Sequence, residues 1–364
     1  MKSITLSEGV EVLGQSVFRG CSKLKELVLP NSVTSIDNFL CEGCSQLESV
    51  VIGDGLKVVP IGAFRNLGSL ESVTFGKKVE QIGEEGFAGC PYLQDVELPS
   101  RLSTIGVSAF QGCTSFVNIT IPSSVRIIST NAFRNCTDMK SVTLSEGVEV
   151  LGQSVFRGCS KLKELVLPNS VTSIDNFLCE GCSQMESVVI GDGLKVVPRG
   201  AFRYLGSLES ITLGKKVETL GENCFADCTN INVIICTNTK PAVWDEKTIA
   251  SYVFSGVIYP TCTLYVPEGC SETYKAANGW KNFYNITEED PSGINNAISK
   301  SLEIFAADGA IVIKSDTAAP FCIYGINGSI EASGNTIIGE LKIPVNTKGI
   351  YIVKVASEVV KVRL

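Results

Sequence analysis

Histidine is absent from the sequence, and its absence removes several kinds of chemistry at once. Ser-His-Asp and Cys-His catalysis, imidazole metal ligands and histidine pH switches all require it. No glycine-rich phosphate loop or EF-hand loop is present. Carboxylate pairs such as Glu84/Glu85 and Glu288/Glu289 are most simply solvated surface or linker charges. We therefore expect no enzyme: no catalytic residues, no cofactor and no metal site.

A basic excess and a long apolar run are also missing. The 364 residues include 31 Lys and Arg against 38 Asp and Glu, a net charge of −7. A nucleic-acid or anionic-membrane partner would favour a basic face, and a membrane-spanning helix needs about 18 apolar residues. We expect neither partner. Met1–Ile4 begins within a repeat unit and shows no signal-peptide pattern, so we expect the native chain to start further upstream.

What dominates the sequence is a repeat of 23 residues. Several ladders of apolar residues recur at this step, and the first reads Ile4, Leu27, Val50, Val73, Val96, Ile119, Val142, Leu165, Val188, Ile211 and Ile234. A second ladder lies two residues further on, and this apolar-x-apolar spacing is typical of a short strand. Later in each unit come a Phe ladder, which includes Phe110, and a Cys ladder, which includes Cys113.

Stacking is the way such units bury their apolar positions, because one unit alone cannot. The pattern predicts a solenoid whose strands stack as one parallel sheet at about 4.8 Å per rung, on the order of 50 Å long. The segment around Phe110 is too short for more than a helical turn, and we expect it to form the opposite wall with the ring pointing inward.

Residues 1–90 recur at 139–228, an offset of 138 residues or six units. Two near-identical surface patches would then lie about 29 Å apart, a spacing suited to avidity toward a repetitive ligand. Neutral recombination between similar DNA repeats is the simpler explanation of the duplication.

Most of the fifteen cysteines belong to the core pattern. Eight occupy one ladder, so we expect small buried side chains. The C-x-x-C pairs Cys41/Cys44 and Cys179/Cys182 also fill core positions, which makes zinc an unfavoured interpretation. Four less regular cysteines leave room for one disulfide near the end of the solenoid; they are Cys224, Cys236, Cys262 and Cys270.

The repeat unit resembles the BspA-like leucine-rich repeats of bacterial surface proteins. The likeness rests on the run from Leu93 through Val96, Leu98, Pro99 and Leu102 to Ile105-Gly106, Ala109-Phe110 and Gly112-Cys113, and it covers 1–287. Residues 237–287 look like the family's closing repeat. The resemblance implies a secreted or outer-surface protein that adheres to host matrix proteins or other cells. The Asn ladder of better-known leucine-rich repeats is missing.

Beyond a polar linker at 288–293 the 23-residue step disappears. Short alternating runs at 294–364, with a turn signal at Asn327-Gly328, predict a small all-β sandwich. Its ending, Gly349-x-Tyr351-x-Val353-Lys354-Val355, looks like the sorting domain of type IX secretion, which would serve export or attachment.

The outward side chains of the stacked strands should form one extended surface. We expect a protein ligand there, bound by a monomer, and the predicted ligand-binding residues are Glu26, Val28, Val51, Thr74, Glu97, Thr120, Glu164, Val166, Val189 and Thr212. Neighbouring valines rimmed by glutamates could contact an extended protein ligand. They could also be β-branched residues that simply suit an exposed strand. The functional alternative is a structural envelope spacer without a specific ligand.

Overall fold

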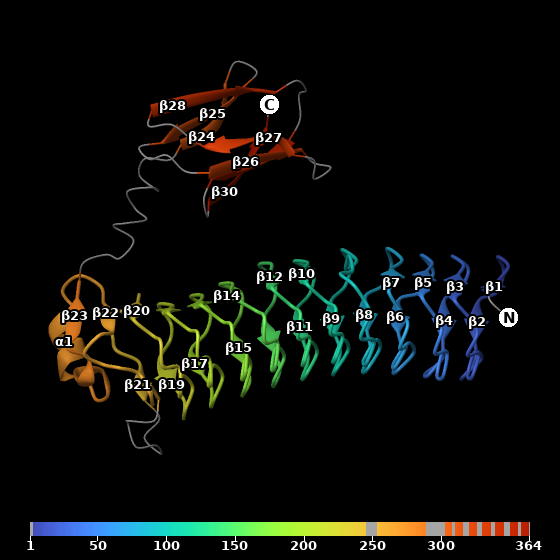
Figure 1. Ribbon diagram of the computed structural model, residues 1–364, viewed down its shortest axis with the longest axis horizontal. Coiled ribbons are helices and arrows are strands. Elements are labelled where there is room, and N and C mark those ends of the chain that lie inside the picture. The colour runs from blue at the N-terminus through green and yellow to red at the C-terminus, as the bar shows by residue number, and fades with distance from the viewer. Residues whose placement is uncertain are drawn as a thin grey trace. The chain divides into compact units, whose positions relative to one another are not determined.

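The computed structural model describes residues 3–244, 253–288, 303–307, 310–315, 320–325, 330–335, 339–345, 350–355 and 358–363. The chain divides into two compact units, Met1–Glu288 and Glu289–Leu364. The first unit is a right-angled stack of rungs, each contributing two short strands and a turn, as the succession from β1 to β23 in Figure 1 shows. The predicted solenoid is confirmed.

One strand of each rung belongs to the β-spine, in which neighbours pair in parallel. Residue i lies opposite residue i+23, as in Val28↔Val51 and Val166↔Val189. The spine strands are β1 (Ser3–Thr5), β3 (Glu26–Leu29), β5 (Ser49–Ile52), β7 (Ser72–Thr74), β10 (Asn118–Ile121), β12 (Ser141–Leu144), β14 (Glu164–Leu167), β16 (Ser187–Ile190), β18 (Ser210–Leu213), β20 (Val233–Cys236), β22 (Thr263–Tyr265) and β23 (Asn285–Thr287).

The second strand of each rung has only two residues and forms a second parallel wall. Its strands are β2 (Val12–Leu13), β4 (Ser35–Ile36), β6 (Val58–Val59), β8 (Gln81–Ile82), β9 (Thr104–Ile105), β11 (Ile127–Ile128), β13 (Val150–Leu151), β15 (Ser173–Ile174), β17 (Val196–Val197), β19 (Thr219–Leu220) and β21 (Val243–Trp244). Hydrogen-bonded pairing runs without a break from β6 to β15.

The third wall consists of turns rather than helix. Its backbone N–H groups donate along the stack, for example Phe87 to Ala109 at 2.8 Å and Gly89 to Gln111 at 2.7 Å. One position in each turn has a left-handed backbone, and it is filled by Ser16, Phe39, Gly62, Glu85, Ser108, Asn131, Ser154, Phe177, Gly200 and Asn223. Glycine, which adopts this conformation without strain, occupies only two of the ten places.

Phenylalanines from the third wall stack through the core, as predicted. Phe64, Phe87, Phe110, Phe133 and Phe156 follow one another with ring centroids 5.3–5.9 Å apart and are fully buried. A second stack joins Phe202, Phe225 and Phe254. Because each ring contacts the rings of the rungs before and after it, the column is continuous over many rungs.

The last rungs close the hydrophobic column with a helix α1 (Ser271–Ala276) and a 3-10 turn η2 (Trp280–Asn282). Tyr274 is fully buried and its hydroxyl donates to Asn238, while the Trp280 indole N–H donates to the Ala242 carbonyl at 2.7 Å. Large aromatic side chains with satisfied polar atoms therefore cover the end of the core.

The expectation of one unbroken spine sheet is wrong. Residues 93–99 form no strand, so the sheet containing β1, β3, β5 and β7 stops at β7 and pairing resumes at β10. A smaller break separates β12 from β14, where the Lys163 N–H lies 3.5 Å from the Lys140 carbonyl oxygen. We call the strandless segment, residues 95–98, the fault; its cause is described with the site below.

The second unit has two antiparallel sheets, one with strand order β24-β25-β28 and one with order β27-β26-β29-β30. The strands are β24 (Glu303–Ala307), β25 (Ala310–Ser315), β26 (Pro320–Gly325), β27 (Ile330–Asn335), β28 (Gly339–Pro344), β29 (Ile350–Val355) and β30 (Glu358–Arg363). Ile311 of the first sheet and Ile323, Tyr351 and Val353 of the second share one core. The predicted turn at Asn327-Gly328, residue Gly349 and the linker beyond Glu288 lie outside the described residues.

Candidate binding face

The outward side chains of the β-spine form a continuous surface, which we call the binding face. Alternation along each strand buries one side chain and exposes the next, as in the Glu26–Leu29 strand. All ten residues predicted for ligand binding lie on this face, exposed or half-buried. They do not converge on one point, because they are spread along the stack from β3 to β18.

Two pairs of valines give the face its apolar spots. Val28 lies opposite Val51, and Val166 lies opposite Val189 in the second copy. Val28, Val51 and Val166 expose 46%, 38% and 44% of their surface, and Val189 is half-buried. The two spots are therefore equivalent in geometry as well as in sequence.

Glutamates border both spots, but only part of their charge is free. Lys25 pairs with Glu48, and Lys163 pairs with Glu186 at 2.7 Å. The hydrogen bond to Glu48 raises the pKa of Lys25. Glu26 and Glu164 form no ion pair within the described residues and are exposed. The rim of each spot therefore keeps a net negative side chain.

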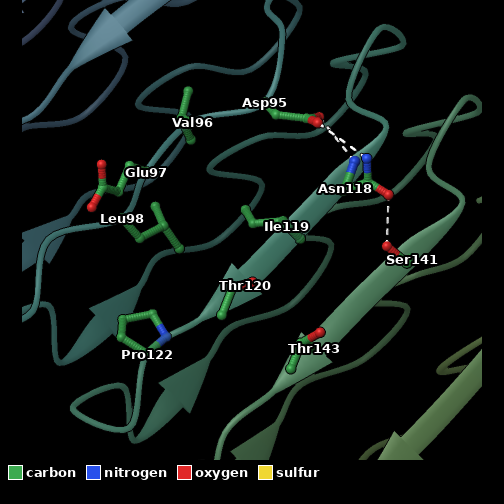
Figure 2. A pocket seen from close by; sticks show the side chains of 10 residues that line it. All are labelled: Asp95, Val96, Glu97, Leu98, Asn118, Ile119, Thr120, Pro122, Ser141 and Thr143. Atoms are coloured by element: carbon green, nitrogen blue, oxygen red, sulfur yellow. Dashed lines mark hydrogen bonds between the residues drawn. The ribbon is translucent and has the colours of Figure 1, made fainter. Parts of the chain in front are cut away.

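The fault lies in the middle of the face, between Thr74 and Thr120. Figure 2 shows Asp95 reaching from the fault toward Asn118 on β10, and Asn118 in turn reaching Ser141 on β12. The Asp95 Oδ1 atom accepts the backbone N–H groups of Val117 at 2.7 Å and Asn118 at 2.9 Å. Ser141 donates to the Asn118 side-chain oxygen at 2.7 Å.

In regular rungs a backbone carbonyl does what Asp95 does here. The N–H groups of Lys140 and Ser141 both donate to the Val117 carbonyl, and those of Glu71 and Ser72 both donate to the Glu48 carbonyl. At the fault the Asp95 carboxylate replaces the Gln94 carbonyl in this role. An ionised carboxylate forms stronger hydrogen bonds than an amide oxygen. The side chain thus displaces the backbone, and residues 95–98 leave the sheet.

Hollows flank the fault on both sides. One of about 560 Å³ lies against β10 and is lined by Asp95, Val96, Asn118 and Thr120 among others. The other, of about 400 Å³, lies against β7 and is lined by Thr74, Phe75, Lys77 and Pro99 among others. Glu97 and Leu98 line both. The two hollows are therefore halves of one groove, which we call the fault groove.

The cysteines provide no reactive centre on this face. Thirteen of the fourteen cysteines with a described side chain are buried, and all fourteen are free thiols. The disulfide considered for Cys224, Cys236, Cys262 and Cys270 is therefore wrong. Burial raises the pKa values of Cys236 and Cys262 to about 12. Within the described residues no group of three or more Cys, His, Asp or Glu could hold a metal ion.

The Cys ladder has a role that sequence reasoning missed. Each thiol donates to the carbonyl of the Phe 26 residues earlier, as in Cys113 to Phe87 at 3.2 Å and Cys136 to Phe110 at 3.2 Å. The thiols therefore satisfy buried backbone acceptors that would otherwise lack a partner. The constant Phe-to-Cys offset was the available signal.

Sequence reasoning also missed the fault. Asp95 stood among the polar outward positions of the ladder, where Ser49, Asn118 and Glu164 are tolerated in strands. The signal was the combination of Asp and Glu at 95 and 97, two residue types that are depleted in strands.

No curated protein with a matching sequence was found. Three solved structures are similar in fold, each with a TM-score below 0.5. A leucine-rich repeat protein from Bacteroides ovatus is 21% identical, with 79% of this chain and 91% of that chain covered and a TM-score of 0.44. A leucine-rich cell surface protein from Faecalibacterium prausnitzii is 20% identical, with 76% and 90% covered and a TM-score of 0.36. The pneumococcal vaccine antigen PcpA is 15% identical, with 79% and 94% covered and a TM-score of 0.32.

The family model for the BspA-type leucine-rich repeat region matches residues 1–117, 80–207 and 150–279, which together span most of the chain. This scaffold is typical of proteins that bind other proteins, and no catalytic family is indicated. No helix among the described residues is long and apolar enough to cross a membrane. With its 23-residue rungs, buried Phe column and exposed parallel spine, the chain belongs to the BspA-type leucine-rich repeat family.

Proposed function

We propose that the binding face docks an extended protein ligand, and that the protein acts at the cell surface or after secretion as an adhesin for host matrix proteins or other cells. The observation that carries this is the duplicated valine spot: exposed apolar side chains in register, Val28 with Val51 and Val166 with Val189. Apolar patches rimmed by polar residues often mark protein interaction sites.

The spacing of the spots supports a role in binding repetitive ligands. Six rungs at about 4.8 Å separate equivalent residues by about 29 Å. A ligand that engages both spots gains an effective-concentration advantage over one that engages a single spot. The C-terminal unit would then serve export or attachment, in the manner of a type IX sorting domain.

Binding of the protein to immobilised matrix proteins and to glycans tests the proposal. We expect saturable, salt-tolerant binding to at least one protein, and its loss in the variant V28K/V51K/V166K/V189K. The matched control is V58K/V196K, which places lysines at two exposed valines of the second wall, 43% and 48% accessible, that are also related by the duplication. Loss in both variants, or no saturable ligand in the panel, would favour the alternative, a structural spacer of the envelope.

A further inference from the structure

The fault groove interrupts the binding face with backbone groups that have no partner. Among the described residues, the N–H groups of Asp95, Val96, Glu97 and Leu98 donate to no protein acceptor, and their carbonyl groups accept no hydrogen bond. Elsewhere on the spine these positions are paired on both sides, as Val50 is with Leu27 and Val73. Open strand edges of this kind are places where another chain can add.

From this geometry we infer that the fault groove binds an extended, basic polypeptide segment. This inference rests on the proposed protein-binding function of the face and names the partner chemistry at one place on it. An extended backbone carries N–H and C=O groups in alternation, and these complement the unpaired groups of residues 95–98. The groove is also of a size that holds several residues rather than an ion.

Charge selects the sign of the segment. Asp95 and Glu97 are both exposed carboxylates in the groove, and Lys77, at its β7 side, is the one cation among the lining residues. Lysine or arginine side chains of a ligand would meet the carboxylates, whereas acidic side chains would be repelled. Complementary charge sets specificity and the rate of encounter more than affinity.

The floor of the groove favours apolar side chains between the basic ones. Leu98 and Ile119 are buried to 7% and 4% exposure, and Val96 and Phe75 are half-buried. These side chains alternate with the polar rim of Glu97, Asn118 and Thr120, which Figure 2 shows on the same side of the groove. A strand in which basic and apolar residues alternate would present one kind of side chain to the floor and the other to solvent and the rim.

Fluorescence polarisation with a labelled decapeptide of alternating lysine and valine tests the inference. Two control peptides accompany it, one with glutamate in place of lysine and one with alternate backbone amides N-methylated. We expect the lysine peptide to bind and each control to bind at least about tenfold more weakly. Equal binding of the N-methylated peptide would overturn the role of the unpaired backbone groups, and no binding of the lysine peptide would overturn the inference as a whole.

Variants locate the site. D95V/E97I copies the residues found at the equivalent positions of the second copy, Val233 and Ile235, and should close the fault and abolish binding. E97K keeps the fault and should shift preference toward the glutamate peptide. The matched control E26V/E164V removes two carboxylates of the same face away from the groove, and should change binding less than threefold. Equal loss in this control would reduce the effect to net charge and contradict the inference.

Hydrogen exchange shows whether each variant is folded as intended. Amides of residues 96–98 should exchange fast in the free protein and become protected both by the lysine peptide and by D95V/E97I. Unprotected amides with saturating peptide would place the peptide elsewhere. If matrix proteins bind through the valine spots while the peptide does not bind, this inference fails and the proposed function stands; the converse result has the opposite meaning.

Discussion

Two stretches of the spine have nearly the same sequence and different surroundings. Ser72–Phe75 reads Ser-Val-Thr-Phe, and its copy Ser210–Leu213 reads Ser-Ile-Thr-Leu. The first ends a sheet, because the following rung is the fault, whereas the second pairs with β20. The strand itself therefore does not determine whether the sheet continues; the next rung does.

The difference between the two following rungs is chemical. Residues 95–98 are Asp-Val-Glu-Leu, and the equivalent residues 233–236 are Val-Ile-Ile-Cys. In the second copy the carbonyl of Asn232 accepts the Thr263 N–H at 2.8 Å, as a regular spine requires. In the first copy the Asp95 carboxylate takes the corresponding N–H groups. One side chain that competes with its own backbone is enough to open a parallel sheet locally.

The largest expected effect concerns the core beneath both stretches. Phe87→Ala and its equivalent Phe225→Ala each remove a fully buried ring that stacks on two neighbours. Each should lose about 3–5 kcal/mol of unfolding free energy in urea denaturation. We expect the two losses to agree within about 1 kcal/mol, because the second wall and the Phe column continue past the fault. A much smaller loss for F87A would show that the fault loosens the core.

The thiol ladder offers the next matched pair. Cys90 and Cys228 each donate to a Phe carbonyl at 3.1 Å, from Phe64 and Phe202 respectively. Cys90→Ala and Cys228→Ala should each lose about 1–3 kcal/mol, since a buried acceptor is left without a donor. Cys90→Ser retains a donor and should lose less. Equal losses for alanine and serine would mean that the thiol hydrogen bonds contribute nothing measurable.

Exchanging the two rungs tests the cause of the fault. D95V/E97I should gain about 1 kcal/mol, the range over which strand propensities differ, and should protect the amides of residues 96–98 from exchange. The reciprocal variant V233D/I235E should expose the amides of residues 234–236. If D95V/E97I leaves the fault amides unprotected, a feature other than Asp95 holds the rung out of the sheet, for example the larger Phe75 in place of Leu213.

The smallest expected effect is a difference in reactivity between the two C-x-x-C pairs. A hydrogen bond with Cys41 lowers the pKa of the Cys44 thiol, whereas burial raises that of its equivalent, Cys182. More of Cys44 is thiolate at any pH below its pKa, so iodoacetamide at pH 8 should modify Cys44 before Cys182. Peptide mapping by mass spectrometry measures the order. Faster labelling of Cys182 would contradict these directions.

Much of this architecture follows from the sequence because a solenoid is local. A step of 23 residues brings Val28 opposite Val51 without any long-range rule, and apolar ladders name the core directly. The fault does not follow so simply, because Asp95 occupies an outward position where polar residues are ordinary. Whether its carboxylate reaches the amides of Val117 and Asn118 depends on the distance between rungs, which no residue pattern contains.

The third wall was hidden for a related reason. Left-handed positions are usually recognised by glycine, yet here they hold Ser108, Glu85 and Phe177. The ligand-binding residues remain predictions for a different reason: they are dispersed along the face, so that geometry does not single them out as a cluster would. Only the groove, which the structure adds, concentrates unpaired groups in one place.

The left-handed ladder has a consequence for how far the array could be strengthened. Eight of its ten residues carry side chains in a conformation that disfavours them by about 1 kcal/mol each. Glycine at such exposed places as Ser16 would relieve that strain, offset in part by the greater freedom of the unfolded chain. Since rungs contribute nearly independently, the gains would accumulate along the stack. The chain therefore holds an untapped thermal reserve in its turns, reachable without touching either the core or the face.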